Sequence, residues 1–226
     1  MSELMAYQLF ESHYEIFLRG LRNSFIALAA GLVLATSLGL VCALVSHNDR
    51  GVLNRIVRTY ITIIRNTPFL VQLYICYFGL PTLGIRLSAF ETGAVALMLN
   101  SGAYIADIIK AGIQAIEKGQ IEAAEALGLT GYQRFRLVIF PQALPQIVQA
   151  VVGQYLIMFQ DTSLMSMVSY PELTRSIMEV GSETYLFLEA FIIGGIIYLV
   201  TLNLMELLSG RLEKRFRMAI PGRGRA

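Results

Sequence analysis

The sequence predicts an all-α membrane protein that forms a single domain over residues 1–226, with five transmembrane helices and one short helix in a connecting loop. Two observations lead to this fold class. Hydrophobic residues make up 55% of the chain and charged residues only 15%, whereas soluble domains average about 45–50% and about 25%. Several runs of mostly apolar residues also approach the roughly 20 residues that a helix needs to cross the hydrocarbon core of a bilayer.

Each predicted span is built around such a run. The first covers about 20–46 and contains no Asp, Glu, Lys or Arg from residue 24 to residue 46. The others are predicted at about 60–80, 90–112, 137–165 and 186–209. These runs are longer than barrel strands and lack their strict alternation, so they favour helices. Residues 6–18 are apolar with scattered charges, a pattern that predicts a helix lying at the membrane surface.

The distribution of Lys and Arg predicts the orientation, because positive charge collects on the cytoplasmic side of inner-membrane proteins. Five spans place 14 of the 18 basic residues on one face and four on the other. The larger group is Arg50, Arg55, Arg58, Arg65, Lys110, Lys118, Arg134, Arg136, Arg211, Lys214, Arg215, Arg217, Arg223 and Arg225. We therefore expect a multi-pass protein of the bacterial cytoplasmic membrane, with its N-terminus outside and its C-terminus in the cytoplasm.

Composition excludes several functional classes. The net charge of +2 gives no basic footprint for nucleic acid. Cys42 and Cys76 both lie inside apolar runs, which indicates small core residues and not a disulfide or metal pair. Only His13 and His47 could join them, so we expect no metal site. The chain also lacks a GxxxxGK[ST] phosphate-binding loop, so it is not expected to hydrolyse ATP itself.

The loop over about 114–136 is the most informative segment. Ile121, Ala124 and Leu127 lie on an apolar stripe at roughly helical spacing, and Gly128 is expected to end the helix. A short helix held between two spans has nothing in its own chain to cover that stripe. It is either a connector that lies on the membrane surface or a docking element for another subunit.

Sequence motifs distinguish these alternatives. Glu122-Ala123-Ala124, then Gly128, then Val138-Ile139-Phe140-Pro141 resembles the EAA loop of ABC-importer permeases, with Val138 and Phe140 replacing the usual Ile and Leu. Further segments resemble the polar-amino-acid permeases of the histidine/glutamine type: Arg65-Asn66-Thr67-Pro68, Asn100-Ser101-Gly102-Ala103-Tyr104, Lys118-Gly119-Gln120, Asp161-Thr162-Ser163-Leu164 and Pro171-Glu172-Leu173. The resemblance extends over about residues 20–217.

The resemblance implies the MetI-like fold of type I importers and a set of partners. These are two ATP-binding cassette subunits, a second permease chain that is identical or a sister, a periplasmic or tethered substrate-binding protein, an amino-acid substrate and membrane lipid. ATP and Mg²⁺ would be bound by the ATPase subunits, and no cofactor by this chain. The residues implied in coupling to the ATPase are Glu122, Ala123, Ala124, Leu127, Gly128 and Arg134.

Polar residues inside the spans are candidates for a substrate pathway, because ionisable groups are expensive at the centre of a membrane. Asp161 either recognises an ammonium group of the substrate or caps the end of its helix. Gln154 lies two turns before it on the same helix face, and either contacts substrate or packs against a neighbouring helix. The predicted pathway residues are Thr67, Gln72, Asn100, Tyr104, Gln154, Asp161 and Ser163.

Two other functions compete with the permease. A stand-alone, ion-coupled secondary carrier would need intramembrane carboxylates, for which Asp107 and Asp161 are the candidates. A membrane-anchored receptor or assembly factor would transport nothing. Neither alternative explains the coupling-type loop, so a permease is the predicted function.

Overall fold

The computed structural model describes residues 2–46 and 51–218, with side chains over 7–46 and 51–211. Its helices are α1 (Ser2–Ser46), α2 (Val52–Arg65), α3 (Phe69–Tyr74), α4 (Leu80–Thr82), α5 (Ala89–Gln114), α6 (Lys118–Ala126), α7 (Gly131–Arg134), α8 (Phe140–Asp161), α9 (Leu173–Thr184) and α10 (Phe187–Met218). Several residues named above lie outside the described residues or have no described side chain: His47, Arg50, Lys214, Arg215, Arg217, Arg223 and Arg225.

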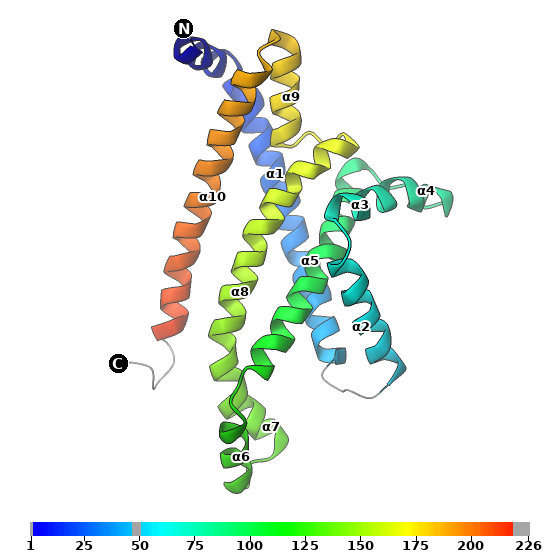
Figure 1. Ribbon diagram of the computed structural model, residues 1–226, viewed down its shortest axis with the longest axis vertical. Helices are drawn as coiled ribbons and strands as arrows, with labels where there is room; N and C mark the ends of the chain where they lie inside the picture. Colours follow the sequence, from blue (N-terminus) through cyan, green and yellow to red (C-terminus); the bar gives the residue numbers. More distant parts are fainter. Residues whose placement is uncertain (1, 47–50, 219–226) are drawn as a thin grey trace.

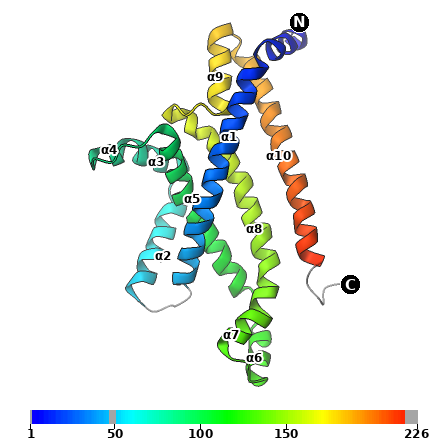
Figure 2. The same cartoon turned by 180° about the vertical axis from the view of Figure 1, so that it is seen from behind.

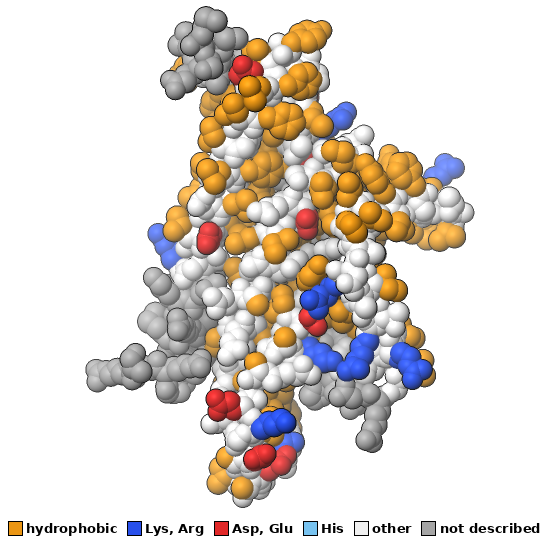
Figure 3. All heavy atoms as spheres, viewed as in Figure 1, with side chains coloured by type: hydrophobic (Ala, Val, Ile, Leu, Met, Phe, Trp, Pro, Cys, Tyr) orange, Lys and Arg blue, Asp and Glu red, His pale blue; other side chains and the backbone are white. Residues whose placement is uncertain are grey.

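Four long helical segments run side by side along the molecule (Figures 1 and 2). Within the described residues, the segments long and apolar enough to cross a membrane are Tyr7–Ser46, Ala89–Gln114, Gly131–Val168 and Phe187–Arg211. They contain the predicted first, third and fourth spans and all of the fifth except residue 186. Helix α9 lies at one end of the molecule and α6 and α7 at the other. Figure 3 shows hydrophobic side chains through the middle and Lys and Arg gathered near α2 and α6.

The chain over the predicted second span, 60–80, does not form one continuous helix. Helix α2 ends at Arg65, and α3 begins at Phe69 after an extended Pro68 (φ −63°, ψ 142°). Proline disfavours helical geometry at the preceding residue and donates no backbone hydrogen bond, which explains the break. Helices α3 and α4 then turn aside from the bundle (Figure 1).

Two π-helical turns, Ile75–Gly79 and Phe135–Ile139, each end two residues before a proline, Pro81 and Pro141. A proline ring clashes with the carbonyl four residues earlier in an α-helix. Residues 77 and 137 both lie in the π turns, whose wider geometry relieves that clash. The second turn lets the chain continue helically from α7 into α8.

Residues 6–18 are helical, and their location at the membrane surface stays a prediction. These residues belong to α1, which is continuous from Ser2. Leu9 and Phe17 are buried against Leu173, Ile177 and Val180 of α9. Two of the apolar residues of this segment therefore find protein partners, whereas Tyr7, Phe10, Tyr14 and Leu18 remain exposed.

Helix α5 is the central element, and small residues bring α1 against it. A Cβ atom added at Gly39 of α1 would lie 2.7 Å from Ile105 Cγ2 and 3.0 Å from the carbonyl oxygen of Gly102, both on α5. In lipid there is no hydrophobic driving force between helices. The van der Waals contacts made possible by this close approach of the two backbones stabilise the helix pair instead. The main core forms around this contact and includes Leu97, Met158 and Phe159.

Replacement by leucine is expected to affect stability differently at two consecutive glycines of α10. A Cβ atom at Gly194 would overlap Ile177 of α9, whereas nothing lies within 4 Å of a Cβ atom at Gly195. We expect Gly194→Leu to destabilise the protein by about 1–3 kcal/mol, the usual cost of overpacking. Gly195→Leu is the matched control and is expected to leave stability unchanged. Thermal denaturation of the two purified variants in detergent would check this, and equal midpoints would contradict it.

Glu172 anchors the start of α9. It lies outside the four long apolar segments, and its side chain is fully buried, with 0% exposed. Its carboxylate accepts hydrogen bonds from the backbone N–H groups of Thr174 (2.9 Å) and Arg175 (2.8 Å) and from the hydroxyl of Tyr198 on α10 (3.0 Å). Ser24 Oγ of α1 also accepts from the Leu173 N–H group at 3.2 Å. Helices α1, α9 and α10 are thereby joined.

Burial raises the pKa of Glu172 to about 7, although the surrounding hydrogen bonds oppose the change. The folded state therefore favours the neutral carboxyl. Its contribution is fully present below the pKa of the unfolded chain, about 4.3, and is lost as the pH rises through 7. We expect wild-type stability to fall by about 3 kcal/mol from this group between pH 4 and pH 8.5.

Thermal denaturation of Glu172→Gln across this pH range is the measurement. The variant should lose that part of the pH dependence, because glutamine does not titrate. Glu11→Gln, at an exposed position of α1, should keep it. An unchanged pH profile in Glu172→Gln would show that Glu172 does not titrate in this range.

Candidate functional site

The break between α2 and α3 opens a cavity of about 490 Å³ between α2, α5 and α8. Its lining residues come from these three helices, the 66–68 connection and the first residue of α3. They are Arg65, Asn66, Thr67, Pro68, Phe69, Asn100, Tyr104, Gln154, Ile157 and Asp161. The wall thus combines one guanidinium group, one carboxylate, three amides and two hydroxyls with the apolar side chains of Pro68, Phe69 and Ile157. We call this the upper cavity.

Buried hydrogen bonds fix the amides of this wall. Gln72 of α3 donates from Nε2 to the carbonyl oxygens of Ile64 (2.8 Å) and Thr67 (3.0 Å). Its Oε1 accepts from Asn100 Nδ2 at 3.0 Å. Gln154 Nε2 donates to Ser101 Oγ at 3.3 Å. Because satisfied polar networks specify one arrangement, Asn100 and Gln154 are held in place on the cavity wall.

The two ionised groups of the upper cavity differ in their partners. Arg65 forms an ion pair with Asp107, and its guanidinium carbon lies 5.5 Å from the centre of the Tyr104 ring. Asp161 is partly buried, and its side chain has no hydrogen bond or ion pair among the described residues. An unpaired carboxylate at this depth is costly, which makes Asp161 the side chain most in need of an external partner.

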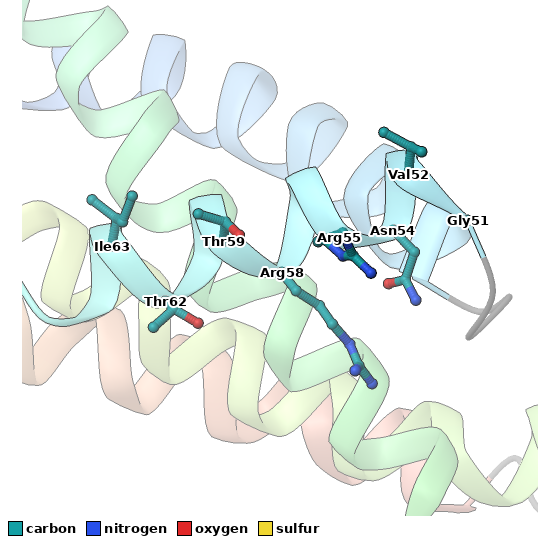
Figure 4. Close-up of a pocket in the computed structure, with 8 residues that line it drawn as sticks. All are labelled: Gly51, Val52, Asn54, Arg55, Arg58, Thr59, Thr62 and Ile63. Atoms are coloured by element: carbon teal, nitrogen blue, oxygen red, sulfur yellow. The ribbon is translucent and has the colours of Figure 1, made fainter.

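Two further cavities continue the upper one along α2. The middle cavity, of about 510 Å³, shares Arg65, Asn66 and Tyr104 with it and adds Asp107 and Lys110. The third, of about 760 Å³, follows the beginning of α2 and shares Arg58 and Thr62 with the middle cavity. Figure 4 shows its lining residues along successive turns of α2, with Arg58 and Thr62 extending to the same side. Together the three cavities form a groove from Gly51 to Asp161.

Most of the predicted pathway residues meet in the upper cavity. Thr67, Asn100, Tyr104, Gln154 and Asp161 all line it. Gln72 does not, because its amide is used to hold Thr67 and Asn100. Ser163 also lies off the wall, in the 3₁₀ turn Thr162–Val168, where its carbonyl oxygen accepts from Ser166 Oγ at 2.7 Å.

Sequence reasoning missed Arg65 and Asn66 as cavity residues, although both belong to the Arg65-Asn66-Thr67-Pro68 segment. In the sequence, Arg65 serves as an orientation charge and as part of a family motif, but not as a predicted pathway residue. The signal that could have found it is the proline that ends the helix three residues later, since a broken helix exposes polar backbone and side chains inside the membrane. The pairing of Arg65 with Asp107 joins residues far apart in sequence and leaves no local signal.

A second site lies at the opposite end of the molecule from α9. Helix α6 ends in a Schellman motif, in which Gly128 has φ +73° and donates to the Glu125 carbonyl oxygen at 2.9 Å. The N–H group of Leu129 donates to the Ala124 carbonyl oxygen at 3.1 Å. Gly128 is therefore required by backbone geometry, because L-residues with side chains rarely adopt this φ.

The apolar stripe of α6 was expected to have nothing in its own chain to pack against. This expectation is wrong for Ala124, one residue of that stripe. Ala124 is buried, and Arg134 is partly buried and forms an ion pair with Glu125. Glu122, Ala123 and Gly128 are exposed, and Leu127 is 80% exposed. The inner side of α6 is thus held against α7, and its outer side presents an apolar side chain to the surroundings.

The whole chain can now be compared with known proteins. Residues 35–218 match the family described as binding-protein-dependent transport system inner membrane component. The chain belongs to this family. It is 33% identical over 201 residues to the arginine transport system permease protein ArtQ of Bacillus subtilis, covering 88% of this chain and 92% of that one. It is 34% identical over 197 residues to the glutamine transport system permease protein GlnP of Escherichia coli, covering 86% and 88%.

Solved structures of this transporter type share the fold. An amino acid ABC transporter crystallised with histidines superposes with a TM-score of 0.87 at 34% identity, covering 91% of this chain and 96% of that one. An inward-facing methionine ABC transporter, MetNI, gives 0.63 at 20% identity, with 96% and 99% covered, and supports the fold alone. The predicted type I importer fold is confirmed, and the family favours a permease subunit over an ion-coupled carrier.

Family membership also indicates which subunit hydrolyses ATP. It is the inner-membrane component of the transporter, and the ATPase resides in a separate subunit. Among the described residues, no group of three or more His, Cys, Asp or Glu side chains could hold a metal ion.

Proposed function

We propose that this chain is one of two permease subunits of an ATP-driven, binding-protein-dependent importer of amino acids. The groove along α2 is its half of the translocation pathway, and α6 is the coupling helix that docks on an ATP-binding subunit. The identities of 33% and 34% to arginine and glutamine permeases support an amino-acid substrate.

One observation carries the proposal more than any other. The groove contains an unpaired carboxylate, Asp161, together with an arginine and three amides in a space of about 490 Å³. Free amino acids carry an ammonium group and a carboxylate, which are the chemical complements of these groups. The groove is also open on the side of Ile157, which is 49% exposed, and we place the second permease chain there, identical or a sister.

The coupling role of α6 rests on its exposed outer side. We propose that Glu122, Ala123, Leu127 and Gly128 contact the ATPase subunit, while Ala124 and Arg134 hold α6 against α7 from behind. Two such ATPase subunits, one for each permease, bind ATP and Mg²⁺. In this arrangement the α6 end and the C-terminus are cytoplasmic, and the α9 end and the N-terminus face outward, where a binding protein delivers substrate.

Reconstitution tests this function. Proteoliposomes would hold this chain with its ATP-binding subunit, a candidate sister permease and the binding protein, and uptake of labelled amino acids would be followed. We expect uptake only when ATP and the binding protein are both present. Uptake driven by an ion gradient without the ATPase would instead establish a secondary carrier and refute the proposal.

A further inference from the structure

The third cavity, at the beginning of α2, contains groups that the proposed transport of amino acids does not use. It has a volume of about 760 Å³, and two guanidinium groups, those of Arg55 and Arg58, line it. No acidic residue occurs among the described residues of its wall. Figure 4 shows Asn54, Arg55 and Arg58 along the first two turns of α2. Lys110 lines the adjoining middle cavity, so this end of the groove is rich in positive charge.

The described chain compensates only part of this charge. The Asp107 carboxylate of the middle cavity is paired with Arg65. The side chains of Arg55 and Lys110 form no ion pair or hydrogen bond with the described residues. Helix α2 adds the positive end of its dipole, because its N-cap residue, Gly51, has no side chain and its first turn contains no acidic residue. An anion at this position would therefore meet positive charge from both side chains and backbone.

Two buried polar atoms without partners indicate independently that this end of the groove holds a ligand. Asn54 lines the third cavity and is only 5% exposed, yet its Oδ1 atom has no hydrogen-bond partner in the described part of the chain. Ser46 lines the middle cavity and is 4% exposed, and its Oγ atom also lacks a partner there. Buried polar atoms are normally satisfied. A hydroxyl can donate to a phosphate oxygen, and an amide oxygen can accept from a hydroxyl group.

We propose that the third cavity binds the phosphate group of an anionic phospholipid from the cytoplasmic leaflet. Guanidinium groups suit this ligand, because their N–H donors match the geometry of phosphate oxygens. Asn54 accepts a hydrogen bond from a hydroxyl of the headgroup. This proposal rests on the orientation given with the proposed function, which places the Gly51 end of α2 in the cytoplasm. The ligand is a structural lipid at the end of the groove and is not transported.

Apolar side chains beside the cavity favour a lipid over a soluble phosphate. Val52 and Ile63 line the cavity and are 77% and 56% exposed. Leu53 and Ile56 of the same helix are 60% and 58% exposed. A soluble anion would leave these side chains uncovered, whereas the acyl chains of a bound lipid remove them from water. Anionic lipids of the cytoplasmic leaflet also attract basic residues that lie near its surface.

Cysteine labelling inside the cavity tests the site. Thr59→Cys places a thiol at an exposed position of the wall, whereas the native Cys42 and Cys76 are buried. The complete transporter would be placed in phosphatidylcholine nanodiscs, with or without about 30% phosphatidylglycerol, and labelled with a neutral maleimide. We expect phosphatidylglycerol to slow labelling of Thr59→Cys by about fivefold or more. Ala115→Cys, at an exposed position that lines none of the three cavities, should be labelled equally in both lipids.

Removing one guanidinium group should remove this protection. In the Thr59→Cys protein, Arg55→Gln is expected to reduce the slowing by about fivefold, the usual contribution of one basic residue at an anionic membrane surface. Arg58→Gln should do likewise if Arg55→Gln does not fold. Arg86→Gln, at an exposed arginine outside the three cavities, should keep the protection. Equal labelling of Thr59→Cys in the two lipids, or unchanged protection in both cavity variants, would overturn the proposal.

A soluble source of the phosphate group is tested in the same nanodiscs. Inorganic phosphate would be added to phosphatidylcholine nanodiscs, with sodium chloride of equal ionic strength as the control. We expect the labelling rate to stay unchanged. Slowing by phosphate as large as that by phosphatidylglycerol would assign the site to a soluble anion and overturn the lipid.

Failure of this proposal and failure of the proposed function are distinguishable. ATP-dependent uptake of amino acids without protection by phosphatidylglycerol would refute the lipid site alone. Protection by phosphatidylglycerol without ATP-dependent uptake of any amino acid would support the lipid site and refute the proposed function.

Discussion

Replacing Gly128 with valine is expected to lower ATP-driven uptake at least tenfold while the protein still inserts into the membrane. Gly128 has φ +73° at the end of α6, and a β-branched residue in this conformation costs about 1–3 kcal/mol. The variant should relieve this strain by opening the Schellman motif, which displaces Leu127 and the end of α6 from the ATPase subunit. ATP hydrolysis should then continue without transport.

The measurement is uptake and ATPase activity in the same proteoliposomes. Gly84→Val is a matched control, because Gly84 also has a positive φ of +82° and no atom within 4 Å of an added Cβ atom. It follows α4, and Figure 1 shows α4 and α6 in separate parts of the molecule. If both variants lose uptake equally, backbone strain alone explains the loss and α6 has no special coupling role. Normal uptake in Gly128→Val would refute that role directly.

Replacing Asp161 with asparagine is expected to lower uptake by roughly 10- to 100-fold. A hydrogen bond to a charged group contributes about 1.5–3 kcal/mol, and each 1.4 kcal/mol is a factor of ten in affinity. Asparagine keeps the size of the side chain but removes the charge that faces the ammonium group. Basal ATP hydrolysis should persist, because Asp161 is distant from α6 along α8.

Concentration dependence of uptake would separate weak binding from misfolding, since a lost ammonium contact raises the substrate concentration needed for half-maximal uptake. Glu206→Gln is the control, because Glu206 is an exposed carboxylate of α10 that does not line the groove. If Asp161→Asn transports like the wild type, the Asp161 carboxylate does not bind substrate.

The long helices were predictable because their apolar runs approach the roughly 20 residues needed to cross the bilayer core. Helical spacing also predicted the pairs on the cavity wall: Asn100 and Tyr104 lie four residues apart, and Gln154 and Asp161 lie seven apart, so each pair shares a face. Gly128 could be assigned to the end of a helix from sequence alone. Glycine adopts a positive φ without a steric penalty, and this preference is local and does not depend on tertiary packing.

Other features depend on contacts between distant segments. Pro68 is equally compatible with the first turn of a span and with a break inside one, and only the packing of α3 on α5 decides between them. Residues 6–18 carry a weak pattern because part of their partner surface belongs to α9, which is more than 150 positions away. Glu172 resembles a surface residue in sequence, and Tyr198 and the backbone of α9 make its burial possible.

The continuous helical path from α7 into α8 has a mechanical consequence. Arg134 beside α6 and Asp161 in the upper cavity are 27 positions apart on this path, which corresponds to about 40 Å at a rise of 1.5 Å per residue. A rigid rod of that length acts as a lever. If it tilts by about 10° around its midpoint, its two ends move by about 3.5 Å in opposite directions. A small displacement of α6 would thus be delivered to the carboxylate at the far end without any change in secondary structure.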